Sequence, residues 1–359
     1  MTRPARVLVR LPNWLGDIVM ATPALAALRR HFATSTLLAA APAPFAPLVS
    51  AVPGIDEVVP LPAGRGLVRV RADAEATAGA RADLVVLLTN SFGSALAARR
   101  AGVPERWGYR ADARGWLLTR RVSRRHRGGP QGRHHSHYYL RLLDALGIAA
   151  TEQPASIDVP AAWRERALAL LAGRGADPSR PVVGLAPGAA YGGAKRWPPA
   201  HVARLVQALA DRTEATMVLV GAAGDRETGH EIESRVRDTA GAASGSGRLV
   251  NLIGATDLPT LAGLAVHARA FVSNDSGAMH LAAAVGTHVI ALFGPTNEHA
   301  TSPLGPHTLL VEDVFCRPCL LRECPIDHRC MKRITPDAVF AAVTPHLSTP
   351  RPAPPEVAR

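Results

Sequence analysis

The sequence lacks any stretch of the roughly 20 apolar residues that a bilayer-spanning helix needs, because charges, proline or glycine interrupt every candidate. Aromatic residues make up only 4% of the chain, which argues against a surface that stacks the bases of single-stranded nucleic acid. The four cysteines all fall between residues 316 and 330, so disulfides cannot be the framework of a chain this long. These absences leave a globular protein, soluble or peripheral to a membrane.

The amino terminus and the net charge indicate where the protein is located and what it binds. Residues 1–6 run straight into an apolar strand-like segment, without the apolar region and cleavage site of a signal peptide, so we expect a cytoplasmic protein. The net charge of +12 and the pI near 10.7 indicate an anionic partner, which is nucleic acid, a membrane surface or a phosphorylated substrate. A general richness in arginine explains the same charge without any partner.

The chain of 359 residues is longer than one hydrophobic core usually supports. Short apolar segments alternate with segments of helical periodicity in both halves, which predicts two α/β domains with doubly wound, parallel sheets. The predicted strands are 6–11, 36–40, 83–88, 182–186, 216–220, 249–252, 270–273 and 289–293, and the predicted helices are 21–32, 44–51, 91–101, 199–210, 225–236, 258–268 and 278–285.

Residues 172–181 are rich in glycine, proline and polar residues, which predicts the linker between the domains. We therefore expect an amino-terminal domain over 1–171 and a carboxy-terminal domain over 182–345. Residues 346–359 contain four prolines and predict a disordered tail. Because doubly wound sheets bind ligands beyond the carboxyl ends of their strands, the two domains would face each other across one ligand-binding cleft.

Three loops that follow predicted strands carry candidate residues. The first holds Asp17, directly before a helix. A carboxylate there either satisfies the free amides of the first helical turn or acts as a general base that takes a proton from an attacking hydroxyl.

The second loop, residues 187–198, is rich in glycine and ends in Lys195 and Arg196. Its amides, with Gly188 letting a ligand approach, and its two cations could hold a diphosphate. It is not a P-loop, because arginine rather than serine or threonine follows the lysine. The alternative is an exposed loop with solvated cations.

The third loop runs from Asn274 to His280 and leads into an apolar helix. Asp275 and Ser276 suit a helix N-cap, and Gly277 lets a ligand reach amides that bind phosphate oxygens well. His280 lies one helical turn beyond Ser276. A plain cap followed by a buried histidine would explain the same residues.

Together these residues make the chain resemble the lipopolysaccharide heptosyltransferase family (glycosyltransferase family 9), and within it the type II branch. The likeness extends to about residue 345. Some members of the family carry hydroxyl residues four and five positions before the lysine. This chain has Tyr191 and Ala190 there, which favours the type II branch. The motifs that carry it are Leu15-Gly-Asp17 with Ala21-Thr-Pro-Ala-Leu25, Asn90-Ser-Phe92, Arg106-Trp-Gly-Tyr109, Pro187-Gly188 with Lys195-Arg-Trp-Pro198, and Asp275-Ser-Gly-Ala-Met-His280 with Phe293-Gly-Pro295.

The resemblance implies the glycosyltransferase B architecture, two Rossmann-like domains of which the second binds ADP-heptose. It implies inverting transfer of L-glycero-D-manno-heptose to the heptosyl-Kdo2-lipid A inner core, with Asp17 as base and Lys195 facing the diphosphate. Catalysis would require no cofactor. Asp275, Ser276, Gly277 and His280 would line the donor site, and Asn90, Ser91 and Arg106 the acceptor side.

Two further segments are rich in one residue type. Residues 120–127 and 133–137 are densely basic, which predicts either contact with the anionic core at the inner membrane or a solvated loop. Cys316, Cys319, Cys324 and Cys330 are spaced C-x2-C-x4-C-x5-C, which predicts either a structural zinc site or four reduced thiols.

Other functions remain open at this point. A related transferase with a different sugar nucleotide or acceptor would share every motif. A basic nucleic-acid-binding protein with a zinc knuckle would explain the charge and the cysteines but leave the strand-end motifs unused. A silent donor-binding scaffold would not need both Asp17 and Lys195.

Overall fold

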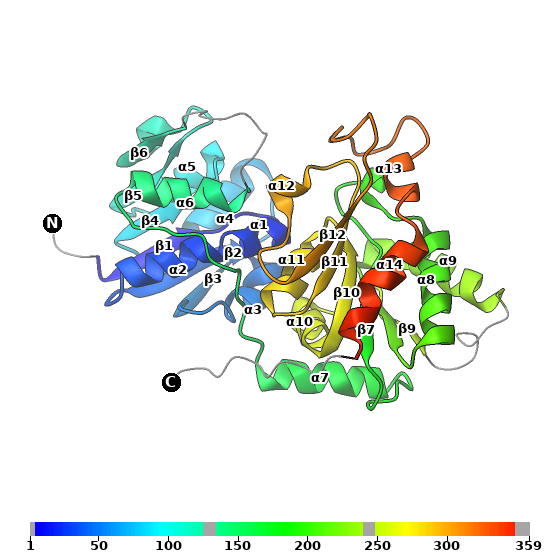
Figure 1. Cartoon of the computed structure of the whole chain (residues 1–359). Coiled ribbons are helices and arrows are strands. Elements are labelled where there is room, and N and C mark those ends of the chain that lie inside the picture. Colours follow the sequence, from blue (N-terminus) through cyan, green and yellow to red (C-terminus); the bar gives the residue numbers. More distant parts are fainter. Residues whose placement is uncertain (1–3, 125–133, 240–247, 349–359) are drawn as a thin grey trace. The chain divides into compact units, whose positions relative to one another are not determined.

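The structure is a computed structural model that describes residues 4–124, 134–239 and 248–348. The chain divides into two compact units (Figure 1). The first comprises residues 1–160 with 299–304, and the second comprises 161–298 with 305–359. Among the described residues, no helix has the length and apolar character needed to cross a membrane.

The first unit is built on a six-stranded parallel sheet in the order β3-β2-β1-β4-β5-β6. Helices α2 and α6 pack together on one face, and α4 and α5 pack together on the other (Figure 1). The strands are β1 (Arg6–Arg10), β2 (Thr36–Pro42), β3 (Glu57–Leu61), β4 (Leu84–Leu87), β5 (Glu105–Arg110) and β6 (Arg120–Ser123). The helices are α1 (Leu15–Met20), α2 (Thr22–His31), α3 (Ala46–Val49), α4 (Gly66–Gly79), α5 (Phe92–Arg100) and α6 (Ser136–Ala145).

The second unit repeats this topology, with the sheet order β12-β11-β10-β7-β8-β9. A core of buried side chains joins one face of the sheet to α8, α9 and α14, while α7, α10 and α11 pack on the other side (Figure 1). The strands are β7 (Val182–Ala186), β8 (Thr216–Leu219), β9 (Leu249–Asn251), β10 (Ala268–Asn274), β11 (Val289–Phe293) and β12 (His307–Val311). The helices are α7 (Ala161–Ala172), α8 (Pro199–Arg212), α9 (Arg226–Arg237), α10 (Leu258–His267), α11 (Gly277–Ala284), α12 (Glu298–Thr301), α13 (Arg329–Lys332) and α14 (Pro336–Val343).

Both sheets therefore have the doubly wound strand order, and the predicted α/β class is confirmed. In each unit the order reverses between two central strands, β1 and β4 in the first and β7 and β10 in the second. Ligands of such sheets bind where this reversal opens a crevice at the carboxyl ends of the strands. The loops after these four strands are accordingly where a site is expected.

The boundary between the units differs from the predicted linker at 172–181. Helix α7 belongs to the second unit because it packs closely on α10, where a Cβ on Gly263 would lie 2.3 Å from the carbonyl oxygen of Trp163. Arg166 of α7 also pairs with Asp257 at 2.9 Å. The glycine-rich segment is thus a loop inside the second unit, and the division falls between Pro160 and Ala161.

The predicted disordered tail begins too early. His346, which follows α14, stacks on His288 with ring centroids 3.7 Å apart, so the folded unit includes it. The ring of His288 also contacts the hydroxyl of Thr308 at 2.9 Å. The rest of the predicted tail, residues 349–359, lies outside the described residues.

This histidine pair predicts a loss of stability in mild acid. Burial, with the nearby His346 and His307, lowers the pKa of His288 to about 4, whereas an unfolded chain takes up this proton near pH 6.5. The stabilising contribution of neutral His288 is therefore complete above about pH 6.5 and is lost as the pH falls towards 4. The melting temperature of His288→Gln should fall less than that of the wild type between pH 7 and pH 5. His31→Gln, on the exposed face of α2, should behave as the wild type; equal slopes for all three proteins would refute the assignment.

Candidate functional site

Two of the three predicted loops and the loop after β11 meet at one edge of the second sheet. Strands β7, β10 and β11 are parallel neighbours, with Ala186 opposite Ser273 and Asn274 opposite Leu292. Their carboxyl ends therefore present residues 187–198, 274–280 and 294–298 side by side. This is the point of strand-order reversal, where a ligand site is expected.

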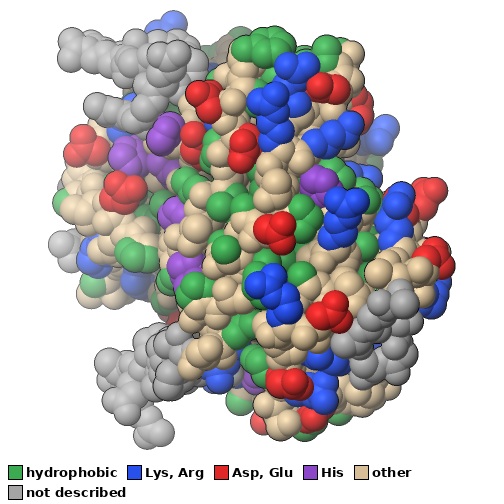
Figure 2. Space-filling view, turned by 45° about the vertical axis from the view of Figure 1, so that its right-hand side comes forward, with side chains coloured by type: hydrophobic (Ala, Val, Ile, Leu, Met, Phe, Trp, Pro, Cys, Tyr) green, Lys and Arg blue, Asp and Glu red, His purple; other side chains and the backbone are tan. Residues whose placement is uncertain are grey.

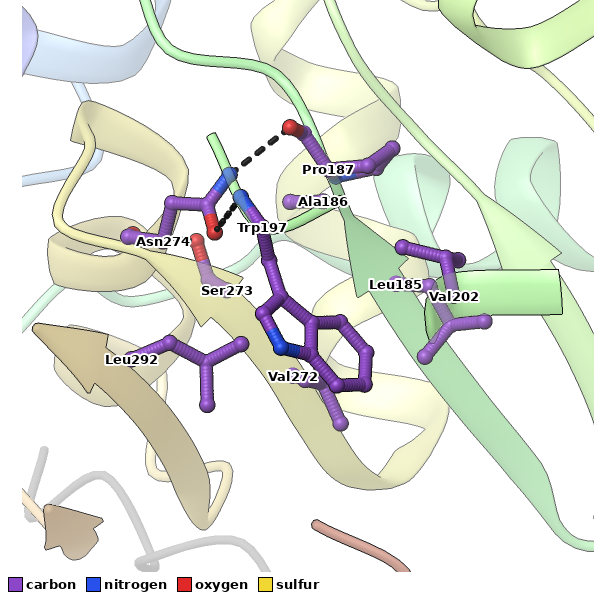
Figure 3. A pocket seen from close by; sticks show the side chains of 9 residues that line it. All are labelled: Leu185, Ala186, Pro187, Trp197, Val202, Val272, Ser273, Asn274 and Leu292. Carbon is purple, nitrogen blue, oxygen red and sulfur yellow. Dashed lines mark hydrogen bonds between the residues drawn. The ribbon is translucent and has the colours of Figure 1, made fainter. Parts of the chain in front are cut away.

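Asn274, the last residue of β10, fixes the glycine-rich loop at both ends. Its side-chain nitrogen donates to the carbonyl oxygen of Pro187 at 2.7 Å, and its side-chain oxygen accepts from the backbone N–H of Trp197 at 3.1 Å (Figure 3). Asn274 is buried, and the Trp197 indole beneath it donates to the carbonyl of Ile334 at 2.9 Å. The small pocket around this junction is lined mainly by apolar side chains such as Leu185, so it belongs to the core rather than to a binding site (Figure 3).

Lys195 and Asp275 form a buried ion pair. The ammonium nitrogen lies 2.6 Å from the Asp275 carboxylate, and the two side chains are 13% and 6% exposed. Thr296, after β11, donates its hydroxyl to the same carboxylate oxygen at 2.7 Å, and the Tyr191 ring lies 4.8 Å from the ammonium. Residues from all three loops thus hold the Lys195 ammonium group at the carboxyl edge of the second sheet.

Arg196 and Gly188 lie together around another carboxylate. The Arg196 guanidinium is 3.1 Å from Asp225, which sits between β8 and α9 and also accepts from the backbone N–H of Ala222. A Cβ on Gly188 would lie 2.3 Å from Asp225, so the close approach requires glycine. Arg196 is therefore held by a carboxylate in this structure, and its contact with a diphosphate stays a prediction.

Helix α11 begins at Gly277 with Ser276 as its N-cap residue. Among the described residues, no side chain caps its amides: the Ser276 hydroxyl contacts that of Ser273 at 3.1 Å, and Asp275 binds Lys195 instead. Ser276 thus occupies the predicted N-cap position without a side-chain hydrogen bond to the helix, and Asp275 does not cap the helix because the ion pair takes its carboxylate. The positive end of α11 faces the same edge as Lys195, while His280 is buried one turn later.

The cysteine segment supports the glycine-rich loop. Within the described residues, no group of three or more histidine, cysteine or acidic side chains is arranged to hold a metal ion, so the structure gives the predicted zinc site at Cys316, Cys319, Cys324 and Cys330 no support. Cys330 is buried in the core, and this burial raises the pKa of its thiol. The sulfur of Cys324 accepts from the backbone N–H of His328 at 3.2 Å.

The same segment hydrogen-bonds to the residues next to Lys195. The N–H of Ala194 donates to the carbonyl of Arg322 at 2.8 Å, and the N–H of Gly193 donates to the Glu323 carboxylate at 2.9 Å. His328 contacts the Ala194 carbonyl at 2.7 Å. The cysteine segment therefore holds the short 3-10 turn that carries Lys195.

In the first unit, Asp17 follows β1 as the third residue of α1, and its side chain is 32% exposed. The imidazole of His135, at the start of α6, lies 3.7 Å from its carboxylate and 3.2 Å from the Tyr139 hydroxyl. Burial, with a smaller effect of the Asp17 charge, raises the pKa of Tyr139. Asp17 thus has a neutral hydroxyl and an imidazole beside it, which suits a carboxylate that accepts a proton.

The predicted acceptor-side residues divide into two kinds. Asn90 follows β4 at the strand-order reversal and donates to the Tyr138 hydroxyl at 2.6 Å. Ser91 caps α5 by accepting from the N–H of Ser94, and Arg106 donates to the carbonyls of Val103 and Leu117. Ser91 and Arg106 therefore make contacts that stabilise the fold, whereas Asn90 contacts a tyrosine hydroxyl at the expected edge.

Sequence reasoning missed four residues of these clusters. Asn274 and Thr296 each follow a predicted strand. That position alone could have marked them as candidate site residues. Asp225 follows β8 in the same way. His135 had no such indication, because it lies near Asp17 only through the packing of α6.

The surface charge does not resemble a nucleic-acid-binding surface on the face drawn in Figure 2. Acidic side chains are interspersed among the lysines and arginines that are described there, rather than leaving one continuous basic stripe (Figure 2).

Comparisons with known proteins show the family to which the chain belongs. Residues 72–329 match the model of glycosyltransferase family 9 (heptosyltransferase). Lipopolysaccharide heptosyltransferase 2 of Escherichia coli K12 is 33% identical over 310 residues, which cover 83% of this chain and 85% of the relative. Lipooligosaccharide heptosyltransferase 2 of Haemophilus ducreyi is 30% identical over 324 residues, which cover 85% of this chain and 88% of the relative.

A solved structure, that of E. coli ADP-heptose LPS heptosyltransferase II, matches 95% of this chain and 98% of its own with a TM-score of 0.79 and 28% identity. These likenesses agree with the two doubly wound units and with the motifs at their strand ends. The chain therefore belongs to glycosyltransferase family 9, the heptosyltransferases, and has their glycosyltransferase B architecture.

Proposed function

We propose that this enzyme transfers L-glycero-D-manno-heptose from ADP-heptose to the heptosyl-Kdo2-lipid A inner core of lipopolysaccharide, with inversion at the anomeric carbon. The observation that carries the proposal is the Lys195–Asp275 pair beside the start of α11. It supports the proposal because a lysine and free helix amides there would stabilise a departing diphosphate. The names of the relatives, and the ADP-heptose in the name of the solved E. coli enzyme, support the choice of sugar and acceptor.

The donor would bind at the edge of the second sheet. A sugar nucleotide gains negative charge on its diphosphate as the glycosidic bond breaks, and a fixed cation with helix amides stabilises that charge. Lys195 would supply the cation and Gly277 the first amide. Gly188, which leaves room beside Asp225, and the buried His280 would complete the binding surface.

The acceptor hydroxyl would be activated in the first unit. Asp17 takes its proton, the oxygen forms a bond to the anomeric carbon, and the bond from that carbon to the diphosphate breaks, so that ADP leaves with the electron pair. A single displacement of this kind inverts the anomeric centre. Asn90 would contact the acceptor from the neighbouring loop.

We place the protein in the cytoplasm, in peripheral contact with the inner membrane, because the acceptor is anchored in lipid. The basic segment at 120–137 would attract the anionic core. Its residues 125–133 lie outside the described residues.

An assay with a panel of donors tests the sugar. The enzyme should release ADP from ADP-heptose in the presence of monoheptosylated Kdo2-lipid A, and the acceptor should gain the mass of one heptose. UDP-glucose and ADP-glucose should give much lower rates. A higher rate with another sugar nucleotide would overturn the heptose proposal and leave the family membership intact.

Thr296 should orient Asp275 for this reaction. Replacing it by valine removes a hydrogen bond to a charged group, worth about 1.5 kcal/mol, so we expect kcat to fall by about tenfold. Thr296→Ser keeps the hydroxyl and should restore the rate. Thr287→Val is the matched control, because its buried hydroxyl bonds the carbonyl of Ala265 far from the carboxyl end of the strands. Equal rates for both valine variants would refute the orienting role.

A further inference from the structure

The first unit exposes a group of large apolar side chains. They are Trp14 (66% exposed), Leu67 (72%), Val68 (76%), Phe92 (38%) and Trp116 (62%). Trp14 follows β1, Phe92 follows β4, and Leu67 and Val68 lie in the first turn of α4. Contiguous exposed apolar surface of this kind marks an interaction site.

Contacts between neighbouring residues join these side chains into one surface. Arg69, one turn into α4, donates to the side chain of Asn13, the neighbour of Trp14. A Cβ on Gly93, next to Phe92, would lie 3.2 Å from the Val70 side chain, so the beginnings of α4 and α5 adjoin.

The contacts continue along α5. The Phe92 ring lies 6.1 Å from that of Trp116, and the Arg99 guanidinium lies 5.6 Å from the Trp116 ring. We call this surface, from Trp14 to Trp116, the apolar rim. It borders Asn90 at the carboxyl end of β4.

The surroundings of the apolar rim are basic. Five arginines lie on the elements that carry the apolar rim, and two acidic residues, Asp73 and Glu75, lie farther along α4; the arginines are Arg65, Arg69, Arg71, Arg99 and Arg100. Arg69 and Arg71 pair with Asp73 and Glu75 farther along α4. Arg65, Arg99 and Arg100 add positive charge at the two ends of the surface.

We propose that the apolar rim and its arginines bind the surface of an anionic lipid bilayer. Tryptophan and aliphatic side chains insert at the boundary of headgroups and acyl chains, while arginines pair with lipid phosphates. The proposal rests on the proposed function, because that function gives the enzyme a lipid-anchored acceptor. It adds the surface that would bring Asp17 and Asn90 to the membrane.

A second copy of the chain fits this surface less well. In a two-fold symmetric dimer the same patch contacts itself, so Arg65, Arg99 and Arg100 of two copies would be brought together. Like charges across an interface oppose association. An anionic bilayer neutralises the same charges.

The test uses the full chain and vesicles of phosphatidylcholine with or without phosphatidylglycerol. The wild type should sediment with the anionic vesicles, and less so at high salt, because screening weakens the pairing with phosphates. The double substitution Leu67→Ser with Val68→Ser should weaken this binding by at least about tenfold, since each side chain loses part of the roughly 1.5–3 kcal/mol of full burial. Phe315→Ser, an equally exposed apolar residue in the second unit, should bind as the wild type.

Three results would overturn the proposal. The first is that the wild type does not bind anionic vesicles, and the second is that the double variant binds them as well as the wild type does. The third is that sedimentation equilibrium shows a dimer for the wild type and a monomer for the double variant. Transfer to an acceptor dispersed in detergent should be unchanged in the double variant, whereas transfer to the acceptor in vesicles should fall. Vesicle binding without any transfer by the wild type would refute the proposed function and leave the membrane surface intact.

Discussion

Asn in place of Asp17 should lower kcat by about 10²- to 10⁴-fold, the usual contribution of a general base. The amide has nearly the shape of the carboxylate but cannot take the acceptor proton. His135, which lies 3.7 Å from the carboxylate, can still contact the amide, and the Asp17 side chain is 32% exposed, so the fold should be unaffected. Donor affinity, measured by calorimetry with ADP-heptose, should match the wild type because the donor residues lie in the second unit.

Asp144→Asn is the control for Asp17. It removes an exposed carboxylate from the end of α6 and should leave kcat unchanged. If Asp17→Asn retains a third or more of the wild-type rate, Asp17 is not the base. If donor affinity falls in parallel with kcat, its role is binding rather than proton transfer.

Methionine in place of Lys195 should have two separate effects. It removes the cation opposite the leaving diphosphate, so kcat should fall by about 10²- to 10³-fold, as for other groups that stabilise developing charge. It also leaves the buried Asp275 carboxylate without its partner, which should lower the free energy of unfolding by about 3 kcal/mol.

The double variant Lys195→Met with Asp275→Asn separates these effects. It removes both charges, so most of the lost stability should return while the rate stays low. Arg235→Met is the control within the second unit: Arg235 and its partner Glu231 on α9 are 50% and 44% exposed, so the loss of this pair should cost little stability. Recovery of the rate in the double variant would show that Lys195 acts only through folding.

The central strands were predictable because they are buried on both faces. Segments such as Val182–Ala186 and Val289–Phe293 are continuous apolar runs, as strands inside a parallel sheet must be. The missed strands lie towards the edges. Glu57–Leu61 is half exposed and contains proline, and Arg120–Ser123 is mostly polar, so neither has the apolar run that marks a central strand.

The domain boundary was missed for a related reason. Glycine and proline mark breaks in secondary structure, but they do not say which side of a break a helix packs on. Helix α7 packs on α10, about 90 residues later in the chain, through Gly263. That contact has no counterpart in local sequence.

The candidate site was predicted as a set of loops but not as a set of contacts. Parallel strands place their carboxyl ends together, so the loops with Lys195 and Asp275 had to share an edge. The ion pair itself joins residues 80 positions apart, and Thr296 enters only because β11 lies beside β10. For the same reason the sequence predicts Asp275 as a helix cap, because its partner Lys195 comes from another loop.

The most direct test of the account is a single turnover assay with ADP-heptose and two acceptors, Kdo2-lipid A with and without its first heptose, read by product mass and by the anomeric configuration of the new linkage. We predict that the monoheptosylated acceptor gains one heptose for each ADP released, with the configuration inverted from that of the donor, and that the acceptor without heptose is a poor substrate. Retention of configuration, or ADP release without a product of that mass, would contradict the account.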